Sequence, residues 1–259
     1  MKIISAEERL KQQTGVKMSI FGPFGIGKTS LLKTLDEPTL CLDFEAGLLA
    51  VQDWPGDSIS VRTWEDARDI ACLIGGANPA SKNIYSPRHF DAVKAKYKDY
   101  DFSKYKCIFV DSITIASKLC LAWCKSQPES FSERNGKPDT RSAYGLLAGE
   151  MSAWLSQFQH IPDKDIIIVG LLESKTDDFN RTTWVPQIEG SKTTLEIPAI
   201  LDEVISMVTI KNETGKLERK FVCRTLNAAG YPAKDRSGRL DETEDAHLGK
   251  LLRKIKVKK

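Results

Sequence analysis

An octapeptide near the amino end constrains this chain more than any other feature. Residues 22–29 read Gly-Pro-Phe-Gly-Ile-Gly-Lys-Thr and match the pattern G-x-x-x-x-G-K-[ST] at every fixed position. An apolar stretch (16–22) precedes the octapeptide, and a helical pattern (28–35) follows it. This context predicts a phosphate-binding loop (P-loop) that joins the first strand to the first helix of an α/β sheet.

Each part of the pattern has a chemical reason. Glycines let the backbone curl so that its N–H groups point at phosphate oxygens, and the dipole of the following helix adds to this field. Lys28 is expected to reach the β- and γ-phosphates, and the Thr29 hydroxyl to ligate Mg²⁺. The motif therefore predicts binding of a nucleoside triphosphate with Mg²⁺. The residues predicted to surround the phosphates are Gly22, Pro23, Phe24, Gly25, Ile26, Gly27, Lys28, Thr29 and Ser30.

A carboxylate on the metal side is predicted at Asp111. Four apolar residues (107–110) form an expected buried strand, and Asp111 follows at its carboxyl end. Ligands of open α/β sheets bind at the carboxyl ends of the strands. Downstream of a P-loop, Asp111 is therefore predicted to hold Mg²⁺ through water.

The general base is predicted at Glu45. Ser112, and not a second acid, follows Asp111, so the residue that orients the attacking water must come from elsewhere. The strand after the P-loop helix ends in two acids, Asp43 and Glu45, at the same edge of the sheet. Glu45 is expected to accept a hydrogen bond from water and direct it at the γ-phosphate. The alternative is that both acids are solvated in a turn.

Alternating strands and helices predict an α/β fold with a mainly parallel central sheet flanked by helices. A late strand pair adds an antiparallel extension on one edge, near the carboxyl end. Strands are expected at 16–22, 39–44, 59–61, 107–110, 165–172, 204–210 and 220–224, and helices at 28–35, 64–74, 113–125 and 143–160. Residues 77–106 read as a surface excursion with a helix, and 173–193 as polar and turn-rich. The chain divides into a short extension (1–15), a core (16–232) and a carboxyl-terminal loop with a basic helical tail (233–259).

Composition indicates a globular protein of the cytoplasm. With 41% hydrophobic and 28% charged residues, the chain can bury a sizeable core. No apolar run is long enough for a bilayer, and the amino end does not resemble a secretory signal. No CxxC pair exists, so the six cysteines are expected to be buried thiols. The basic segment 250–259 is either an arm for polyanions or a solvated helix end.

The order of these motifs resembles the RecA/RadA class of ATPases, and within it the small phage proteins that keep only a RecA-like core and anneal single strands. That class has a P-loop, a Glu at the end of the next strand and an Asp-Ser pair at the metal strand. The similarity covers roughly residues 16–255. Its marks are 43–47 (Asp-Phe-Glu-Ala-Gly), 111–114 (Asp-Ser-Ile-Thr), 143–145 (Ala-Tyr-Gly), 186–190 (Pro-Gln-Ile-Glu-Gly) and 234–236 (Lys-Asp-Arg).

The resemblance implies a homo-oligomer with ATP at its subunit boundaries. A Lys-x-Arg element from the neighbouring subunit completes the site in that class. Lys234 and Arg236 match it, and are expected to stabilise transition-state charge in trans. The alternative is an ordinary charged β-turn. The resemblance also favours ATP over other nucleotides and, for a phage-encoded protein, the host cytoplasm.

The same class binds single-stranded DNA through two loops. The matching segments are about 131–141 and 175–192. Cations for phosphates and an aromatic ring for base stacking suit unspecific binding of single strands. The alternative is a mobile surface loop. The predicted DNA-binding residues are Lys175, Arg181, Trp184 and Lys192.

The leading hypothesis is a DNA-stimulated, Mg²⁺-dependent ATPase that binds single strands and promotes annealing and recombination. Its expected partners are single-stranded DNA, other copies of the chain and a single-strand binding protein, and no membrane. Two alternatives stay open. One is a P-loop kinase of a small molecule, and the other is a nucleotide-binding adaptor or loader for replication proteins with little hydrolysis.

Overall fold

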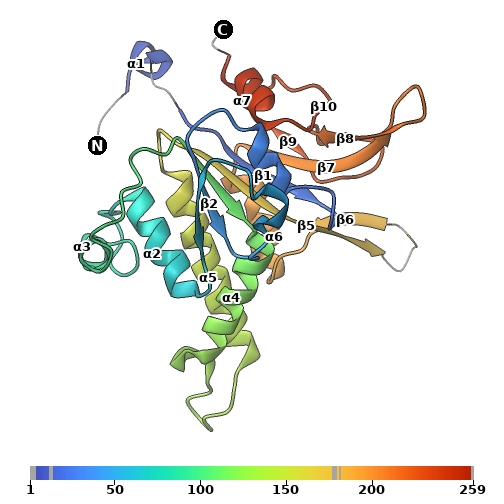
Figure 1. Cartoon of the computed structure of the whole chain (residues 1–259). Coiled ribbons are helices and arrows are strands. Elements are labelled where there is room, and N and C mark those ends of the chain that lie inside the picture. Colours follow the sequence, from blue (N-terminus) through green and yellow to red (C-terminus); the bar gives the residue numbers. More distant parts are fainter. Residues whose placement is uncertain (1–3, 12–13, 177–179, 181, 258–259) are drawn as a thin grey trace.

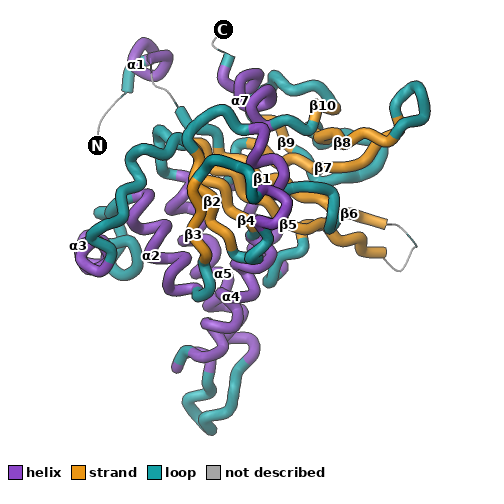
Figure 2. The backbone as a smooth tube through the Cα atoms, viewed as in Figure 1, coloured by secondary structure: helices purple, strands orange, loops and turns teal. Residues whose placement is uncertain are grey.

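The computed structural model describes residues 4–11, 14–176, 180 and 182–257 of the 259-residue chain. A central sheet carries helices on both faces (Figures 1 and 2). The strands are β1 (Lys17–Gly22), β2 (Thr39–Asp43), β3 (Asp57–Ser60), β4 (Cys107–Asp111), β5 (Asp165–Thr176), β6 (Thr182–Pro186), β7 (Glu203–Lys211), β8 (Leu217–Val222), β9 (Lys234–Asp235) and β10 (Thr243–Asp245). The helices are α1 (Ala6–Lys11), α2 (Trp64–Gly75), α3 (Pro87–Lys96), α4 (Ile113–Ser126), α5 (Thr140–Gln159), α6 (Ser191–Ile200) and α7 (Leu248–Lys256), with 3₁₀ turns η1 (Thr29–Thr34), η2 (Leu48–Val51) and η3 (Pro128–Ser130).

The strand order confirms the predicted fold class. Within the described residues the sheet runs β10-β8-β7-β1-β5-β4-β2-β3, with β6 on β5 and β9 on β7. The strands from β3 to β7 in this order are parallel, whereas β8 and β10 are antiparallel to their neighbours. The expected antiparallel extension thus lies at the edge formed by β8 and β10. Its first strand, β7, also pairs in parallel with β1 and belongs to the parallel core.

Continuous apolar runs in the central strands follow from burial of the sheet on both faces. In β5, Ile166 and Ile168 point to one hydrophobic cluster, whereas Ile167 and Val169 point to the other. The residues of β4 divide in the same way. Because side chains alternate along a strand, a strand covered on both faces needs apolar residues at successive positions. The predicted strands 107–110 and 165–172 are confirmed for this reason.

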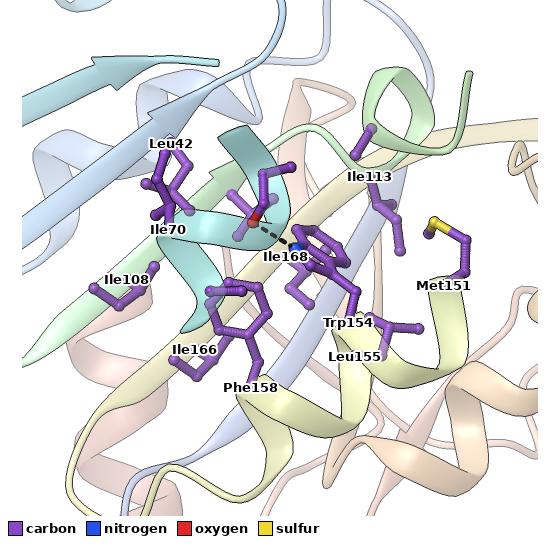
Figure 3. Close-up of a cluster of buried hydrophobic side chains, with 14 of the residues drawn as sticks. Leu42, Ile70, Ile108, Ile113, Met151, Trp154, Leu155, Phe158, Ile166 and Ile168 are labelled. Carbon is purple, nitrogen blue, oxygen red and sulfur yellow. Dashed lines mark hydrogen bonds between the residues drawn. The ribbon is translucent and has the colours of Figure 1, made fainter. Parts of the chain in front are cut away.

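Helices α2, α4 and α5 cover one face of the sheet. Trp154 of α5 is fully buried there and donates a hydrogen bond from its indole Nε1 to the Ala67 carbonyl of α2 at 3.1 Å (Figure 3). Its ring lies 5.7 Å from that of Trp64 and 5.0 Å from that of Phe158. This aromatic group fixes α2 and α5 to each other, since its polar nitrogen is satisfied inside the core.

The other face is covered by η1 and by α7 near the carboxyl end. The apolar side of α7 contributes Leu248, Leu251, Leu252 and Ile255 to the same cluster as β1 and η1. Its basic side makes ion pairs, among them Lys256 with Asp165 at 2.6 Å. Lys250, Arg253 and Lys254 also pair with acids, while residues 258–259 lie outside the described part. The described cations of the basic segment thus pair with acids of this chain, and a role of the segment as an arm for polyanions stays a prediction.

The helix expected at 28–35 is present as a 3₁₀ helix and not as an α-helix. The segment forms a six-residue 3₁₀ helix, η1, in which the Leu31 and Leu35 N–H groups bond to carbonyls three residues earlier. Pro38 disfavours helical backbone at Glu37, the residue before it, so the helix ends before that position. Short helices of this kind are commonly 3₁₀ helices.

The polar segment 173–193 contains more regular structure than expected. Strand β5 continues to Thr176 and pairs with β6 to form a two-stranded ribbon that extends beyond the core (Figures 1 and 2). Helix α6 begins at Ser191. The polar composition is explained by the outer part of the ribbon, 174–176 and 182–183, which is exposed, whereas Leu172 and Trp184 at its base pack against the core.

The six cysteines are free and buried, as predicted. In the described part of the chain, no helix combines the length and the apolar character needed to span a bilayer.

A buried acid lies at the start of β7. Glu203 is 1% exposed; its Oε1 accepts a hydrogen bond from the Ser237 N–H at 3.2 Å, and its Oε2 has no partner among the described residues. Burial, and secondly the charge of Asp235, raise the pKa of Glu203 from 4.5 to about 8. Between these two pKa values the folded chain binds a proton that the unfolded chain does not.

We therefore expect the contribution of Glu203 to the free energy of unfolding to be complete below the unfolded pKa and to fall as the pH rises towards 8. Glu203→Gln mimics the protonated acid and should remove this part of the pH dependence. Melting temperatures measured from about pH 5 to pH 8.5 test this. A change of about 1 kcal/mol in the free energy of unfolding should shift the melting temperature by about 2–4 °C. Exposed Glu242→Gln is the control. An unchanged pH slope in Glu203→Gln would contradict the prediction.

Candidate nucleotide-binding site

The predicted site residues meet at the carboxyl-terminal edge of the parallel strands. Gly22 ends β1 and pairs with Leu171 of β5, whereas Asp111 ends β4 and pairs with Asp43 of β2. Because β5 lies between β1 and β4, the P-loop and Asp111 are separated by one strand. The register alone therefore brings together residues that are far apart in the sequence.

The P-loop has the curled backbone that its glycines predict. Gly25 and Gly27 have φ of 72° and 95°, which glycine adopts without strain. Gly22 packs closely, since a Cβ at this position would lie 2.8 Å from the Met207 carbonyl oxygen. Phe24, at the tip, is 89% exposed. The loop is thus fixed at its base and open to solvent at its tip.

Lys28 is folded back over the loop. Its ammonium group donates hydrogen bonds to the carbonyl oxygens of Gly22 at 3.0 Å and Pro23 at 2.9 Å. Burial lowers the pKa of Lys28, and the charges of Asp111 and Glu45 oppose this shift. The cation lies where the motif requires it, close to both the loop and the carboxylates.

Thr29 and Asp111 are in contact, as their shared role predicts. The Thr29 hydroxyl donates to Asp111 Oδ2 at 2.6 Å. Asp111 is 3% exposed, and its burial raises its pKa to about 6; Glu45 and Asp43 add to the shift, while Thr29 and Lys28 oppose it. The result is a buried oxygen pair with excess negative charge nearby.

This oxygen pair fits Mg²⁺. Hydroxyl and carboxylate oxygens are the hard ligands that Mg²⁺ prefers, and Mg²⁺ at phosphate sites keeps several waters and few protein ligands. Accordingly, the described residues contain no cluster of three or more His, Cys, Asp or Glu side chains suited to a metal. Thr29 and Asp111 would hold the ion together with the phosphates.

Glu45 lies beside Asp111, held by a residue whose role the sequence analysis missed. The Ser112 hydroxyl donates a hydrogen bond to the Glu45 carboxylate. Asp43 fixes the turn that carries Glu45, since its Oδ1 accepts from the N–H groups of Glu45 at 3.1 Å and Gly47 at 3.3 Å. Asp43 is buried and Glu45 is exposed. The two acids therefore have distinct roles in the turn, and only Glu45 is free to contact water.

Lys234 and Arg236 lie away from the P-loop of their own chain. Lys234 Nζ donates to the Leu201 carbonyl at 2.8 Å, and Arg236 Nη1 donates to Asp202 Oδ1 at 2.7 Å. Both side chains thereby cap the carboxyl end of α6, towards the amino-terminal edge of the sheet. They do not join the site in cis, and their action in trans stays a prediction.

The predicted DNA-binding residues fall on the β5–β6 ribbon and the start of α6. The Lys175 side chain is 66% exposed and pairs with Glu173 at 2.9 Å. Lys192 is 73% exposed and lies 3.8 Å from Glu196. Trp184 is half-buried and stacks on Tyr231, with ring centroids 5.2 Å apart. Arg181 lies outside the described residues.

Arg219 is a further residue that the sequence analysis overlooked. From β8 its guanidinium reaches the P-loop, with Nη1 at 3.5 Å from the Ile26 carbonyl oxygen. Alternation along β8 places Arg219 on the same face as buried Phe221. No local pattern shows that this face adjoins the P-loop, because the contact joins residues far apart in the chain.

The P-loop, its metal-side carboxylate and the parallel sheet define a P-loop domain of the ATPase type. A model of the AAA domain family matches residues 14–237, which is most of the chain. The chain therefore belongs to the AAA domain family.

Two solved structures are similar to the chain at low identity. One is an ATPase of the type III secretion system of pathogenic bacteria, with 17% identity and a TM-score of 0.41 over 75% of this chain. This chain spans about half of that one, 51%. The other is the flagellar accessory protein FlaH from Methanocaldococcus jannaschii, with 12% identity and a TM-score of 0.32 over 88% of this chain and 87% of that one. No curated protein matches the chain.

Lys28→Ala should abolish nucleotide binding, because it removes the cation that balances phosphate charge inside the loop. Equilibrium titration with a fluorescent ATP analogue measures this. Lys33→Ala is the matched control, since Lys33 lies on η1 and pairs with Asp53 at the surface. A Lys28→Ala protein that binds as tightly as wild type would show that the loop does not hold the phosphates.

Proposed function

We propose that the chain hydrolyses ATP at the P-loop with Mg²⁺. The observation that carries this proposal is the pair of contacts Thr29–Asp111 and Ser112–Glu45 at the mouth of the loop. The first contact joins two metal ligands. The second aims an exposed carboxylate at the same place, which is what water activation requires.

In this proposal each side chain has one task. Lys28 leaves the carbonyls of Gly22 and Pro23 for the phosphate oxygens, which bind a cation more strongly. Mg²⁺, when bound, neutralises charge on the phosphates. Glu45 accepts a hydrogen bond from the attacking water, and the Ser112 hydroxyl keeps the carboxylate turned towards Asp111.

Glu45→Gln should bind ATP as wild type does but fail to turn it over. The amide can accept the Ser112 hydrogen bond, yet it cannot take a proton from water, so phosphate release should fall about 10²–10⁴-fold. Steady-state phosphate release and ATP titration give the two readings. Glu37→Gln, an exposed acid that precedes β2, is the control. Normal turnover in Glu45→Gln would remove Glu45 from the mechanism.

The finer proposal is that ATP controls binding of single-stranded DNA, as in the recombinase class that anneals strands. The support is the position of β5. This strand pairs with β1 and β4 through Leu171 and Val169, and continues into the ribbon that carries Lys175. A change at the phosphate site therefore has a direct structural route to the ribbon.

The charges on this surface suit an exchangeable polyanion. Lys175 and Lys192 pair with acids of their own segments, and exposed pairs of this kind contribute only about 0–1 kcal/mol. Phosphates of a nucleic acid can replace such partners at little cost. Trp184 of the ribbon stacks on Tyr231 of the loop between β8 and β9, and aromatic rings are what single-stranded bases stack on.

Charge reversal at Lys175 and Lys192 together should weaken DNA binding in the presence of ATP. The logarithm of the binding constant falls linearly with the logarithm of the salt concentration, and the loss of two phosphate contacts should make this slope less steep by about 1.4. Fluorescence anisotropy of a labelled oligonucleotide at several salt concentrations measures this. The matched control reverses the charges of Lys82 and Lys98, which are exposed and lie outside the ribbon and α6.

Phosphate release titrated with DNA then separates the candidate functions. Stimulation that disappears in Lys28→Ala supports the DNA-dependent ATPase. Turnover indifferent to DNA, with no DNA binding in ATP, would reject that proposal and favour a kinase of a small molecule. Nucleotide binding with negligible hydrolysis would favour an adaptor or loader.

A further inference from the structure

Arg219 occupies the space beside the P-loop. Its Nη1 lies 3.5 Å from the Ile26 carbonyl oxygen, and a Cβ added to Gly27 would come within 2.4 Å of the same nitrogen. The positive φ of Gly27 is what requires glycine there, since the end of an arginine side chain can move aside. Both distances place the guanidinium of Arg219 against the phosphate loop.

Arg219 has no acidic partner among the residues that the structure describes. In the described part of the structure, no carboxylate lies within ion-pair distance of its guanidinium, although Lys220, the next residue, pairs with Asp245 at 2.7 Å. An arginine without an acidic partner beside a phosphate-binding loop is available to bind an anion. Its planar fork of donors matches phosphate oxygens.

The position of the Arg219 side chain is set by a strand and not by a loop. On β8, Phe221 is fully buried in the cluster that contains Leu31 and Leu32 of η1. Arg219 precedes Phe221 by two residues and points to the same face, where it reaches the loop that leads into η1. Burial of Phe221 therefore fixes the direction from which the guanidinium approaches.

Arg219 approaches the loop from the side opposite to Asp111 and Glu45. In the sheet order, β8 and β7 lie on one side of β1, whereas β5, β4 and β2 lie on the other. If Glu45 directs water at the γ-phosphate, the bond that breaks lies on the far side of that phosphate, because the attack is in line. The leaving phosphate therefore faces the side from which Arg219 comes.

We infer that Arg219 is a cis phosphate ligand that binds the α- and β-phosphates, on the leaving-group side of the nucleotide. The inference rests on the proposed function, since the direction of attack is taken from Glu45. It gives the β7–β8 hairpin a direct contact with bound nucleotide. ADP keeps both of these phosphates, so Arg219 should contribute as much to the affinity for ADP as to the affinity for ATP.

The test is equilibrium binding by the full chain of fluorescent ADP and of a non-hydrolysable ATP analogue. Arg219→Ala should weaken both about ten- to hundredfold, and Arg219→Lys less, because a lysine keeps the charge but loses the fork. Lys220→Ala is the matched control: it removes one charge from the same strand on the opposite face, and should bind as wild type. Thermal unfolding of each variant shows that the fold is retained.

The outcomes separate this inference from the proposed function. Wild-type protein that binds neither nucleotide would contradict the proposed function, and the inference with it. If the wild-type protein binds both nucleotides, and Arg219→Ala and Lys220→Ala bind them equally tightly, the inference alone is overturned. A loss confined to the ATP analogue would also overturn it, since the guanidinium would then contact the γ-phosphate.

Discussion

The parallel pairing of β1, β5, β4 and β2 is the constraint on which the site depends. It brings Gly22, Asp111 and Asp43 to one edge, although the chain between them is long. A slip of one residue in a central strand would exchange the side chains that fill the two hydrophobic clusters and move the end of the strand by about 3.3 Å. Both clusters are closely packed, so exchanged side chains of other shapes would fit them poorly. The same burial that stabilises the sheet therefore sets the geometry of the site.

That burial also places charges where they are costly without a ligand. Asp111 has its pKa raised to about 6 and Lys28 has its pKa lowered, chiefly because each is withdrawn from water. The chain satisfies them internally, with Thr29 on the carboxylate and two loop carbonyls on the ammonium. These internal partners are the groups that a metal ion and phosphates would replace. The structure thus holds its site residues close together while keeping each of them hydrogen-bonded.

The sequence predicted the parts of the site that depend on local pattern. Asp111 was identifiable because an apolar strand ends at it, and Glu45 because the neighbouring strand ends two residues before it. Arg219 and Ser112 were not, since their roles come from contacts across the fold, with Ile26 and Glu45. The ribbon β5–β6 escaped prediction for another reason: its outer residues, 174–176 and 182–183, are exposed on both faces and so show no apolar alternation.

The positions of Lys234 and Arg236 restrict how copies of this chain can complete each other's sites. Both residues lie towards the amino-terminal edge of the sheet, on the carboxyl end of α6, whereas the P-loop lies at the carboxyl-terminal edge. A single copy cannot bring the two together without unfolding β9. If the fingers act in trans, each copy must place its finger surface against the P-loop edge of another copy, through either a heterologous or a two-fold contact. Repetition of a heterologous contact gives a ring when the rotation closes and a helical filament when it does not. A two-fold dimer can complete both sites only if its two sheets run antiparallel, because each copy must then present its finger edge to the P-loop edge of the other.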